Sequence, residues 1–165
     1  MEKSSVNIKW LTRSAILLAV ALVFQLGGFP QFITGPVINT VLYLAVILVG
    51  VSSGILIGIL TPVIAFMTGI LPPVLAPMIP FIAIGNGLLA VVFSLLKPVN
   101  SVLGVLGASI IKFGLLAIAV TFLVDVPGPV AQMMSTPQLI TAIAGGIFAL
   151  IIYKGLQSAG IESNK

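Results

Sequence analysis

The sequence predicts an all-α integral membrane protein with six transmembrane helices, both termini in the cytoplasm and a single domain over residues 1–165. Composition is the first reason, because 59% of the residues are hydrophobic and only 6% are charged, whereas a soluble domain carries about 25% charged residues. The second reason is that the apolar residues form six runs separated by turn-forming segments, and about 20 apolar residues in a helix span a bilayer. The third is that lysine and arginine gather at the ends of these runs, as they do beside membrane helices.

Most side chains that enzymes use for chemistry are missing from the sequence. There is no cysteine and no histidine, which removes disulfides, thiolate nucleophiles, imidazole bases and the usual zinc ligands. The three acids, Glu2, Asp125 and Glu162, lie outside the apolar runs, so a carboxylate-pair enzyme is not expected. We therefore expect a protein without enzymatic activity, cofactor or metal. The net charge of +4 requires no nucleic acid, because membrane topology explains the basic residues.

The first predicted helix spans residues 10–26 and follows a short basic start. The segment has features of a signal peptide, but its Ala-x-Ala sequence at residues 19–21 lies inside the apolar run, so we expect the helix to be retained. Ala15 and Ala19 fall on one face of this helix. Small residues at this spacing let another helix approach closely, and that helix can belong to the same chain or to a partner.

A loop without charge is predicted at residues 27–36, where glycine and proline break the helix. Phe29 and Phe32 in this loop either cap a binding site or act as ordinary interface aromatics. The second helix is predicted at residues 37–51, and Asn39 in its first turn makes that end of the helix polar.

The third helix is predicted at residues 54–70, after a tight turn at residues 52–54. Gly54 and Gly58 form a small-residue face that favours close packing. Pro62 in the middle of this helix predicts a kink, because proline removes one backbone hydrogen bond. The carbonyl that is freed either binds a ligand or is satisfied by a neighbouring side chain or water.

Four prolines between residues 71 and 80 predict a rigid, partly buried loop that leads into the fourth helix, at residues 81–96. This helix contains Asn86. An amide inside a bilayer needs hydrogen-bond partners, so Asn86 is predicted either to contact a ligand or to tie two helices together.

The fifth predicted helix, residues 102–124, carries a single charge, Lys112. A lysine inside the membrane costs roughly 2.5 to 3.5 kcal/mol and usually faces a cavity or a partner. Since no acid lies inside the apolar runs, Lys112 is the leading candidate for contact with an anionic ligand. The alternatives are that its stem reaches back to the nearer interface, or that it has a structural hydrogen-bonding role.

The sixth helix is predicted at residues 138–153, and its small residues form a face suited to close packing: Ala142, Gly145, Gly146 and Ala149. With six crossings, one side of the membrane receives six basic residues: Lys3, Lys9, Arg13, Lys97, Lys154 and Lys165. Asp125 falls on the other side. The excess of basic residues then places both termini in the cytoplasm. Lys112 lies a little short of halfway across, so it joins an outward-facing cavity only if that cavity reaches the middle of the membrane.

Four features of the chain together resemble the substrate-binding membrane subunit (S component) of energy-coupling factor (ECF) transporters. They are Ala15-x-x-x-Ala19 after a basic start, Gly35-Pro-Val-Ile-Asn39, the segment from Pro72 to Asn86, and Lys112. Such transporters bring vitamins and other micronutrients into prokaryotic cells. The resemblance covers essentially the whole chain in size and hydropathy.

The resemblance implies a location in the plasma membrane of a prokaryote and capture of a small-molecule nutrient from the outer side. It implies that Ala15 and Ala19 dock on a transmembrane coupling subunit, which joins two cytoplasmic ATPases. By the same resemblance Asn39, Asn86 and Lys112 are ligand-binding residues. Gly35 and Pro36 would shape the capping loop. One lysine without a nearby acid favours a vitamin or precursor that carries a carboxylate.

Two other functions remain open from the sequence. A self-contained channel or exporter requires a polar stripe along a pore, which the sequence does not show. A structural or assembly protein would use the small-residue faces alone. The chain has no Gly-x-x-x-x-Gly-Lys loop, so ATP hydrolysis through that motif is expected only in partner subunits.

Overall fold

The computed structural model describes the backbone of residues 2–160 and the side chains of residues 8–160. Within this range six long helices make up the fold: α1 (Glu2–Leu26), α2 (Gln31–Leu48), α3 (Val51–Met67), α4 (Ile79–Leu96), α5 (Ser101–Ile118) and α7 (Thr136–Ser158). Three short helical segments connect them: η1 (Pro73–Met78), η2 (Ala119–Leu123) and α6 (Gly128–Met133). No strand occurs in the described range, and the predicted all-α class is confirmed.

Five helical segments are long and apolar enough to cross a membrane, and α3 is a shorter apolar helix of 17 residues. Large apolar side chains are exposed on the outside of the bundle, among them Val23 on α1 at 68% and Ile110 on α5 at 56%. Such an exterior suits contact with lipid tails, because apolar side chains are stable against hydrocarbon, whereas they would be unfavourable against water. The fold therefore has the character of a multi-pass membrane protein.

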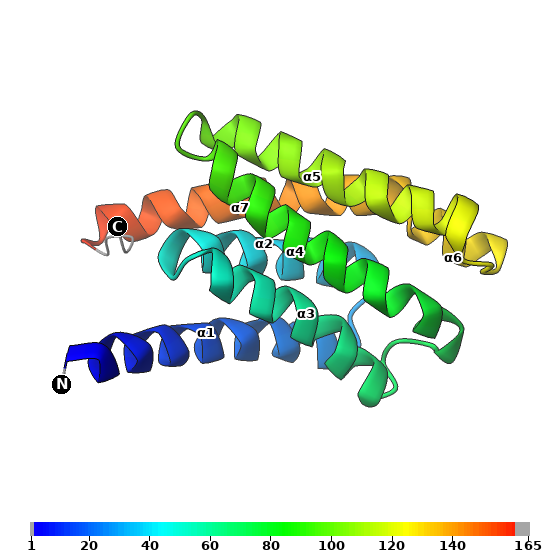
Figure 1. The fold of residues 1–165 in the computed structure, drawn as a ribbon, viewed down its shortest axis with the longest axis horizontal. Helices are drawn as coiled ribbons and strands as arrows, with labels where there is room; N and C mark the ends of the chain where they lie inside the picture. Colours follow the sequence, from blue (N-terminus) through cyan, green and yellow to red (C-terminus); the bar gives the residue numbers. More distant parts are fainter. Residues whose placement is uncertain (1, 161–165) are drawn as a thin grey trace.

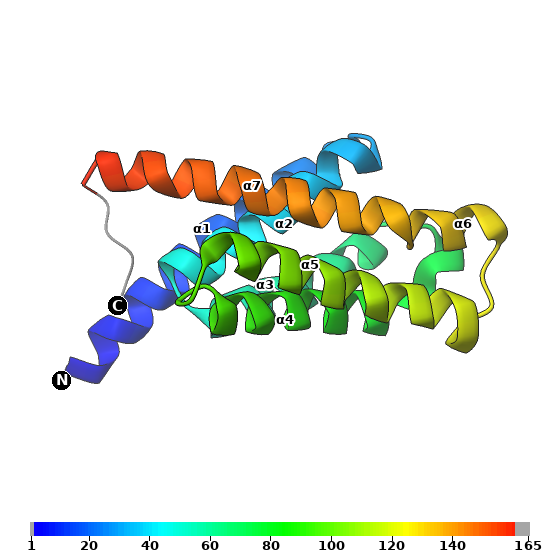
Figure 2. The same cartoon turned by 90° about the horizontal axis from the view of Figure 1, so that it is seen from above.

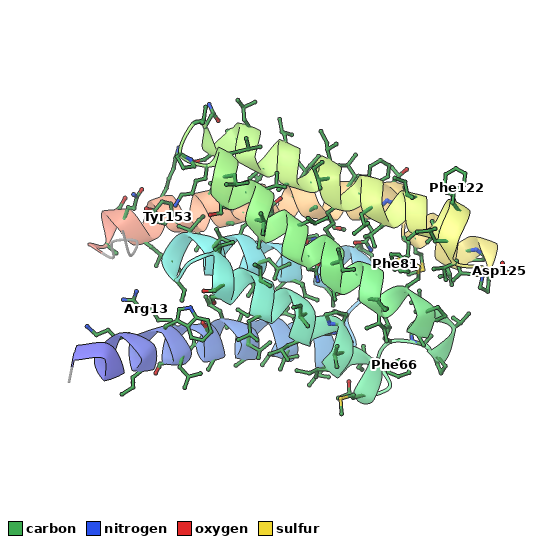
Figure 3. All side chains as sticks on the ribbon, viewed as in Figure 1. Arg13, Phe66, Phe81, Phe122, Asp125 and Tyr153 are labelled. Atoms are coloured by element: carbon green, nitrogen blue, oxygen red, sulfur yellow. The ribbon has the colours of Figure 1, made fainter. Side chains whose placement is uncertain are left out.

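The long helices run mostly lengthwise along the molecule (Figures 1 and 2). The start of α1, the end of α7 and the α2–α3 and α4–α5 connections lie at one end, which we call the terminal end (Figure 1). The α1–α2 connection, η1 and α6 lie at the opposite end, which we call the loop end. Figure 3 shows Arg13 and Tyr153 toward the terminal end and Asp125 at the loop end.

The other described basic residues outside the helix interiors also belong to the terminal end: Lys9 in α1, Lys97 after α4 and Lys154 near the end of α7. The sequence predicts that the basic residues lie on one side of the membrane, and in the structure the described ones outside the helix interiors lie at one end of the bundle. Lys165 and the side chain of Lys3 lie outside the described residues.

The predicted loop at residues 27–36 is wrong in its second half, because α2 already begins at Gln31. Gly35 and Pro36 therefore lie inside a helix and not in a capping loop. Pro36 sits in the second turn of α2, where it removes one backbone hydrogen bond. Membrane helices tolerate such a proline when neighbouring groups satisfy the freed carbonyl. Side chains of the next turn also bond this segment: Asn39 Nδ2 donates to the Gly35 carbonyl and Thr40 Oγ1 to the Pro36 carbonyl.

The predicted turn at residues 52–54 is also wrong, since α3 begins at Val51. The chain reverses at Gly50, which has a φ of 130°. Residues with a Cβ rarely adopt a positive φ of this kind, so glycine is favoured here. The proline-rich segment behaves as predicted. It forms the 3₁₀ segment η1, and Leu75 and Met78 are buried, so this connection is partly buried.

Small residues bring helices into close contact at two places, as predicted. A Cβ added at Gly58 on α3 would lie 2.8 Å from the Cβ of Asn86 on α4. On α7 the four small residues of the predicted face are all buried: Ala142, Gly145, Gly146 and Ala149. A Cβ at Gly145 would lie 2.6 Å from the Cβ of Asn39 on α2. These glycines let α3 reach α4, and α7 reach α2, at backbone distance.

Tyr43 on α2 anchors the core nearer the terminal end. Its side chain is fully buried, and its hydroxyl lies 3.0 Å from Ser109 Oγ and 3.3 Å from the Val105 carbonyl, both on α5. Its ring meets the ring of Phe93 on α4 edge to face, with centroids 4.8 Å apart. One side chain thus joins three helices, because an aromatic body packs while its polar tip is hydrogen-bonded.

Tyr43→Phe is expected to lower the free energy of unfolding by about 1 to 2 kcal/mol, because the buried Ser109 hydroxyl then loses its hydrogen bond to Tyr43. Thermal unfolding in detergent measures the effect. Tyr153→Phe is the matched control, since the Tyr153 hydroxyl bonds Gln157 at an exposed position. Equal unfolding temperatures for Tyr43→Phe and the unchanged protein would contradict the anchoring role.

Candidate ligand-binding site

A cavity of about 560 Å³ lies among the helices toward the loop end. All six long helices contribute to its wall, together with residues 28–29, 69–72 and 130–134 of the connections. Small-molecule sites in proteins commonly measure about 300 to 1,000 Å³. The cavity is therefore of a size that holds one small organic molecule.

Four of the five residues predicted to bind ligand line this cavity: Gly35, Asn39, Asn86 and Lys112. The fifth, Pro36, is not part of the lining, because its place inside α2 turns it toward α7, where its carbonyl approaches Gly145. The fold thus brings together residues from α2, α4 and α5 that are far apart in the sequence.

Lys112 lies at the inner part of the cavity wall and is 4% exposed. Its Nζ donates a hydrogen bond of 2.7 Å to Asn39 Oδ1. The stem of the side chain passes close to Gly85, where an added Cβ would lie 3.4 Å from Lys112 Cγ. Lys112 therefore points into the bundle and not back to an interface, and the cavity extends inward far enough to include it.

Asn39 holds the amine of Lys112 in a defined position. Its Nδ2 donates a 2.9 Å hydrogen bond to the Gly35 carbonyl one turn earlier in α2. Because a backbone carbonyl only accepts, this bond places the amide oxygen on the other side, toward Lys112. A lysine ammonium has three N–H donors, and Asn39 takes one of them. No carboxylate among the described side chains pairs with Lys112, so further donors are available to a ligand.

Asn86 ties α4 to α3 and also lines the cavity, so both predicted roles have a structural basis. Its Nδ2 donates a 2.9 Å hydrogen bond to the Gly58 carbonyl. That carbonyl would normally accept from the N–H four residues later, but this residue is Pro62, which has none. Asn86 therefore supplies the donor that α3 lacks at its proline.

Besides Thr61, four polar residues of the site were not singled out from the sequence: Gln25 on α1, Gln31 and Thr34 on α2, and Gln138 on α7. Gln25 is 8% exposed, and its Nε2 donates a 2.9 Å hydrogen bond to the Thr61 carbonyl on α3. Thr61, the residue before Pro62, is likewise buried and lines the cavity. Gln25 lies near the end of the first predicted helix, residues 10–26, so it is a weaker signal than Asn86, which lies within its apolar run.

Three buried atoms around the cavity have no hydrogen-bond partner among the described residues: Gln25 Oε1, Thr61 Oγ1 and Asn86 Oδ1. Apolar side chains complete the wall: Ile38, Pro62, Ala65, Leu71, Leu75, Ile82, Val130, Met133 and Met134. Of the two phenylalanines considered as caps, Phe29 lines the cavity, whereas Phe32 is 73% exposed and does not. The cavity thus combines one amine, several oxygen acceptors and an apolar wall.

Ala15 and Ala19 lie outside this site, on the exposed face of α1. The opposite face of α1 contacts the bundle, where Ser14 Oγ lies 2.7 Å from Ser53 Oγ and Ala21 is fully buried. The alternative in which the two alanines contact a helix of the same chain is therefore wrong. They are available on a surface that also carries Ile16 and Val23.

A second hollow, of about 430 Å³, lies on the outside of α3 and α4. Its wall consists of apolar residues and glycine, among them Ile55, Ile84 and Leu88. It offers no polar side chain that could orient a ligand.

The described residues also contain no group of three or more histidine, cysteine or acidic side chains that could hold a metal ion. Comparisons of the chain with protein-family models, curated proteins and solved structures found no match.

Proposed function

We propose that this chain is the substrate-capturing membrane subunit of an ECF-type uptake transporter in the plasma membrane of a prokaryote. Its ligand is a small nutrient with a carboxylate, such as a vitamin or a vitamin precursor. The observation that carries the proposal is the pairing of Lys112 with Asn39 in the wall of a ligand-sized cavity.

The surroundings of Lys112 support a carboxylate ligand. Hydrogen bonds between an ammonium and a carboxylate are shorter and roughly twice as strong as neutral ones. A lysine in the middle of a membrane helix is costly and is usually functional. Asn39 alone leaves N–H donors of Lys112 unused, and a ligand carboxylate accepts them without any change in the fold.

The distribution of charge supports an outward-facing cavity. Lys9, Arg13, Lys97 and Lys154 gather at the terminal end, and Asp125 lies at the loop end. Basic residues favour the cytoplasmic side, and this supports a topology with both termini in the cytoplasm. The cavity, whose wall includes the loop-end connections, then receives its ligand from outside the cell.

The apolar core beyond the cavity favours a capturing subunit over a channel. Between the cavity and the terminal end the bundle is filled by buried side chains that include Leu42, Leu89 and Phe93. A channel needs a continuous polar or hydrated path, which this core interrupts. Release of the ligand to the cytoplasm then requires a conformational change of the bundle. We propose that a coupling subunit and two cytoplasmic ATPases drive this change.

Purification with native membrane partners, followed by native mass spectrometry, tests the proposal. We expect one small-molecule adduct per chain, together with one coupling subunit and two ATPases. A ligand-free homo-oligomer without ATPases, under conditions that preserve other transporters, would argue for a channel or an assembly protein instead.

Replacing Ala15 and Ala19 by leucine is expected to reduce recovery of the coupling subunit and ATPases about tenfold or more, because bulky side chains prevent close helix approach. Ligand binding should be retained, since both alanines lie outside the cavity. Gly114→Leu on α5 is the matched control, because a Cβ there has no neighbour within 4 Å among the described atoms. Full recovery of the ATPases with the double variant would contradict docking through this face.

A further inference from the structure

We propose that the cavity has a second recognition element, formed by Gln25 Oε1, Thr61 Oγ1 and Asn86 Oδ1, which binds an uncharged N–H or O–H donor group of the ligand. The ligand is then a monocarboxylate that also carries a neutral amide, urea or hydroxyl group. This inference rests on the proposed function for the carboxylate at Lys112 and extends it to the other part of the molecule. We call the three atoms the acceptor cluster.

The acceptor cluster surrounds one turn of α3. Gln25 comes from α1 and bonds the Thr61 carbonyl, and Asn86 comes from α4 and bonds the Gly58 carbonyl. Residues 58 and 61 are three positions apart and therefore neighbours on one face of the helix. All three residues line the cavity, and their free oxygens are buried beside it, where α3 meets α1 and α4.

The orientation of the two amides follows from the chemistry of their partners. Backbone carbonyls accept hydrogen bonds and cannot donate them, so the NH₂ group of each amide must face its carbonyl. The amide oxygens of Gln25 and Asn86 therefore remain as acceptors and cannot be exchanged with the nitrogens by a flip. Their side chains are 8% and 3% exposed, and Thr61 is 1% exposed. Buried polar atoms in native proteins almost always have a partner, and a bound donor group supplies it.

The chemistry of the acceptor cluster also predicts the charge of the ligand group that binds it. Acceptor oxygens repel a second anion and require N–H or O–H groups. The only cation in the cavity wall, Lys112, is already committed to Asn39 and the carboxylate. A dicarboxylate would leave one of its charges among oxygens, and a plain fatty acid would leave the cluster unpaired. A neutral donor group avoids both costs.

The two recognition elements are neighbours on α4. Gly85 touches the stem of Lys112, and the next residue, Asn86, belongs to the acceptor cluster. Apolar side chains such as Ile38 and Ile82 form the wall around them. A ligand with a short apolar linker between its carboxylate and its donor group matches this arrangement.

Three series of probe acids test the inference on the purified full chain: monoamides of straight dicarboxylic acids from succinic to suberic acid, the corresponding monomethyl esters, and the diacids. The ester keeps the carboxylate, the linker and the second carbonyl but has no N–H. At the linker length that fits, we expect the monoamide to bind about tenfold or more tightly than the ester, because the ester leaves buried acceptors unpaired. The diacid should also bind more weakly than the monoamide. Isothermal titration calorimetry gives the affinities.

Thr61→Val removes one acceptor while keeping the shape of the side chain. The hydroxyl has no partner among the described residues, so the unfolding temperature should not fall, while the ratio of monoamide to ester affinity should fall about threefold to tenfold. Thr40→Val is the matched control. Its hydroxyl bonds the Pro36 and Gly145 carbonyls, so that variant should lose stability without losing the preference for the monoamide.

The possible outcomes separate this inference from the proposed function. Equal binding of monoamide and ester at every length would overturn the acceptor cluster and leave the carboxylate at Lys112 intact. Preference for the diacid would also overturn it. Failure of every acid to bind would overturn both the cluster and the carboxylate assignment, whereas recovery of the ATPase partners tests the transporter assignment independently.

Discussion

Lys112→Met is expected to abolish binding of the carboxylate ligand, with a loss of about 2 to 5 kcal/mol in binding free energy, which corresponds to about thirtyfold or more in affinity. Methionine matches the length and apolar character of the lysine stem but lacks the amine, so the contact with Gly85 on α4 is preserved. The carboxylate would then enter a buried cavity without a cation, and burying an unpaired charge is strongly unfavourable.

The fold should survive this substitution. Removing an amine from the membrane interior is favourable, whereas Asn39 Oδ1 loses its donor, which is unfavourable; we expect the two effects nearly to cancel in the unfolding temperature. Native mass spectrometry of the small-molecule adduct measures binding, and thermal unfolding measures stability. Lys154→Met at the terminal end is the matched control. An unchanged adduct with Lys112→Met would show that the carboxylate assignment is wrong.

Gly145→Val is expected to have the largest effect on stability, a loss of about 3 kcal/mol or more in the free energy of unfolding. A Cβ at this position would lie 2.7 Å from the Pro36 carbonyl and 2.9 Å from the Thr40 backbone nitrogen. These are backbone atoms of α2, which cannot rotate away as a side chain can. The two helices must separate, and the hydrogen bond from Thr40 Oγ1 to the Gly145 carbonyl is lost with them.

The same substitution should weaken ligand binding, because the added side chain also meets the Cβ of Asn39, 2.6 Å from the new Cβ, and Asn39 positions Lys112. Gly114→Val is the control, since its Cβ would meet no described atom within 4 Å. Thermal unfolding in detergent compares the two variants. Similar unfolding temperatures for both would mean that the contact between α7 and α2 is less tight than described.

The helices could be predicted from the sequence because six apolar runs, each near the length that a bilayer requires, are separated by turn-forming segments. Their ends could not be predicted as well, and Pro36 shows why. Proline usually marks a helix boundary, but inside α2 the chain keeps its helical path, and the side chains of Asn39 and Thr40 bond carbonyls of the preceding turn. Such compensation depends on neighbours that a local pattern does not reveal.

Three of the eight polar residues that line the cavity could be predicted for a similar reason. Lys112, Asn39 and Asn86 stand out because a polar residue inside an apolar run is costly. Gln25 lies near the end of its run, where an amide is unremarkable, and a threonine such as Thr61 is less costly in a membrane helix than an amide or a charge. Their role depends on a contact between residues 36 positions apart, which becomes visible only when α1 and α3 are packed together.

The polar groups of the cavity are spread over all six long helices: Gln25 on α1, Gln31, Thr34 and Asn39 on α2, Thr61 on α3, Asn86 on α4, Lys112 on α5 and Gln138 on α7. During biosynthesis a nascent helix partitions from the translocon into lipid largely on its own hydrophobicity. A segment with one to three such groups among its apolar residues still partitions, whereas a segment carrying the whole set would stay in water. Maturation of the site therefore follows insertion, and the site is complete only when α7, which follows the other five long helices in the chain, has joined them.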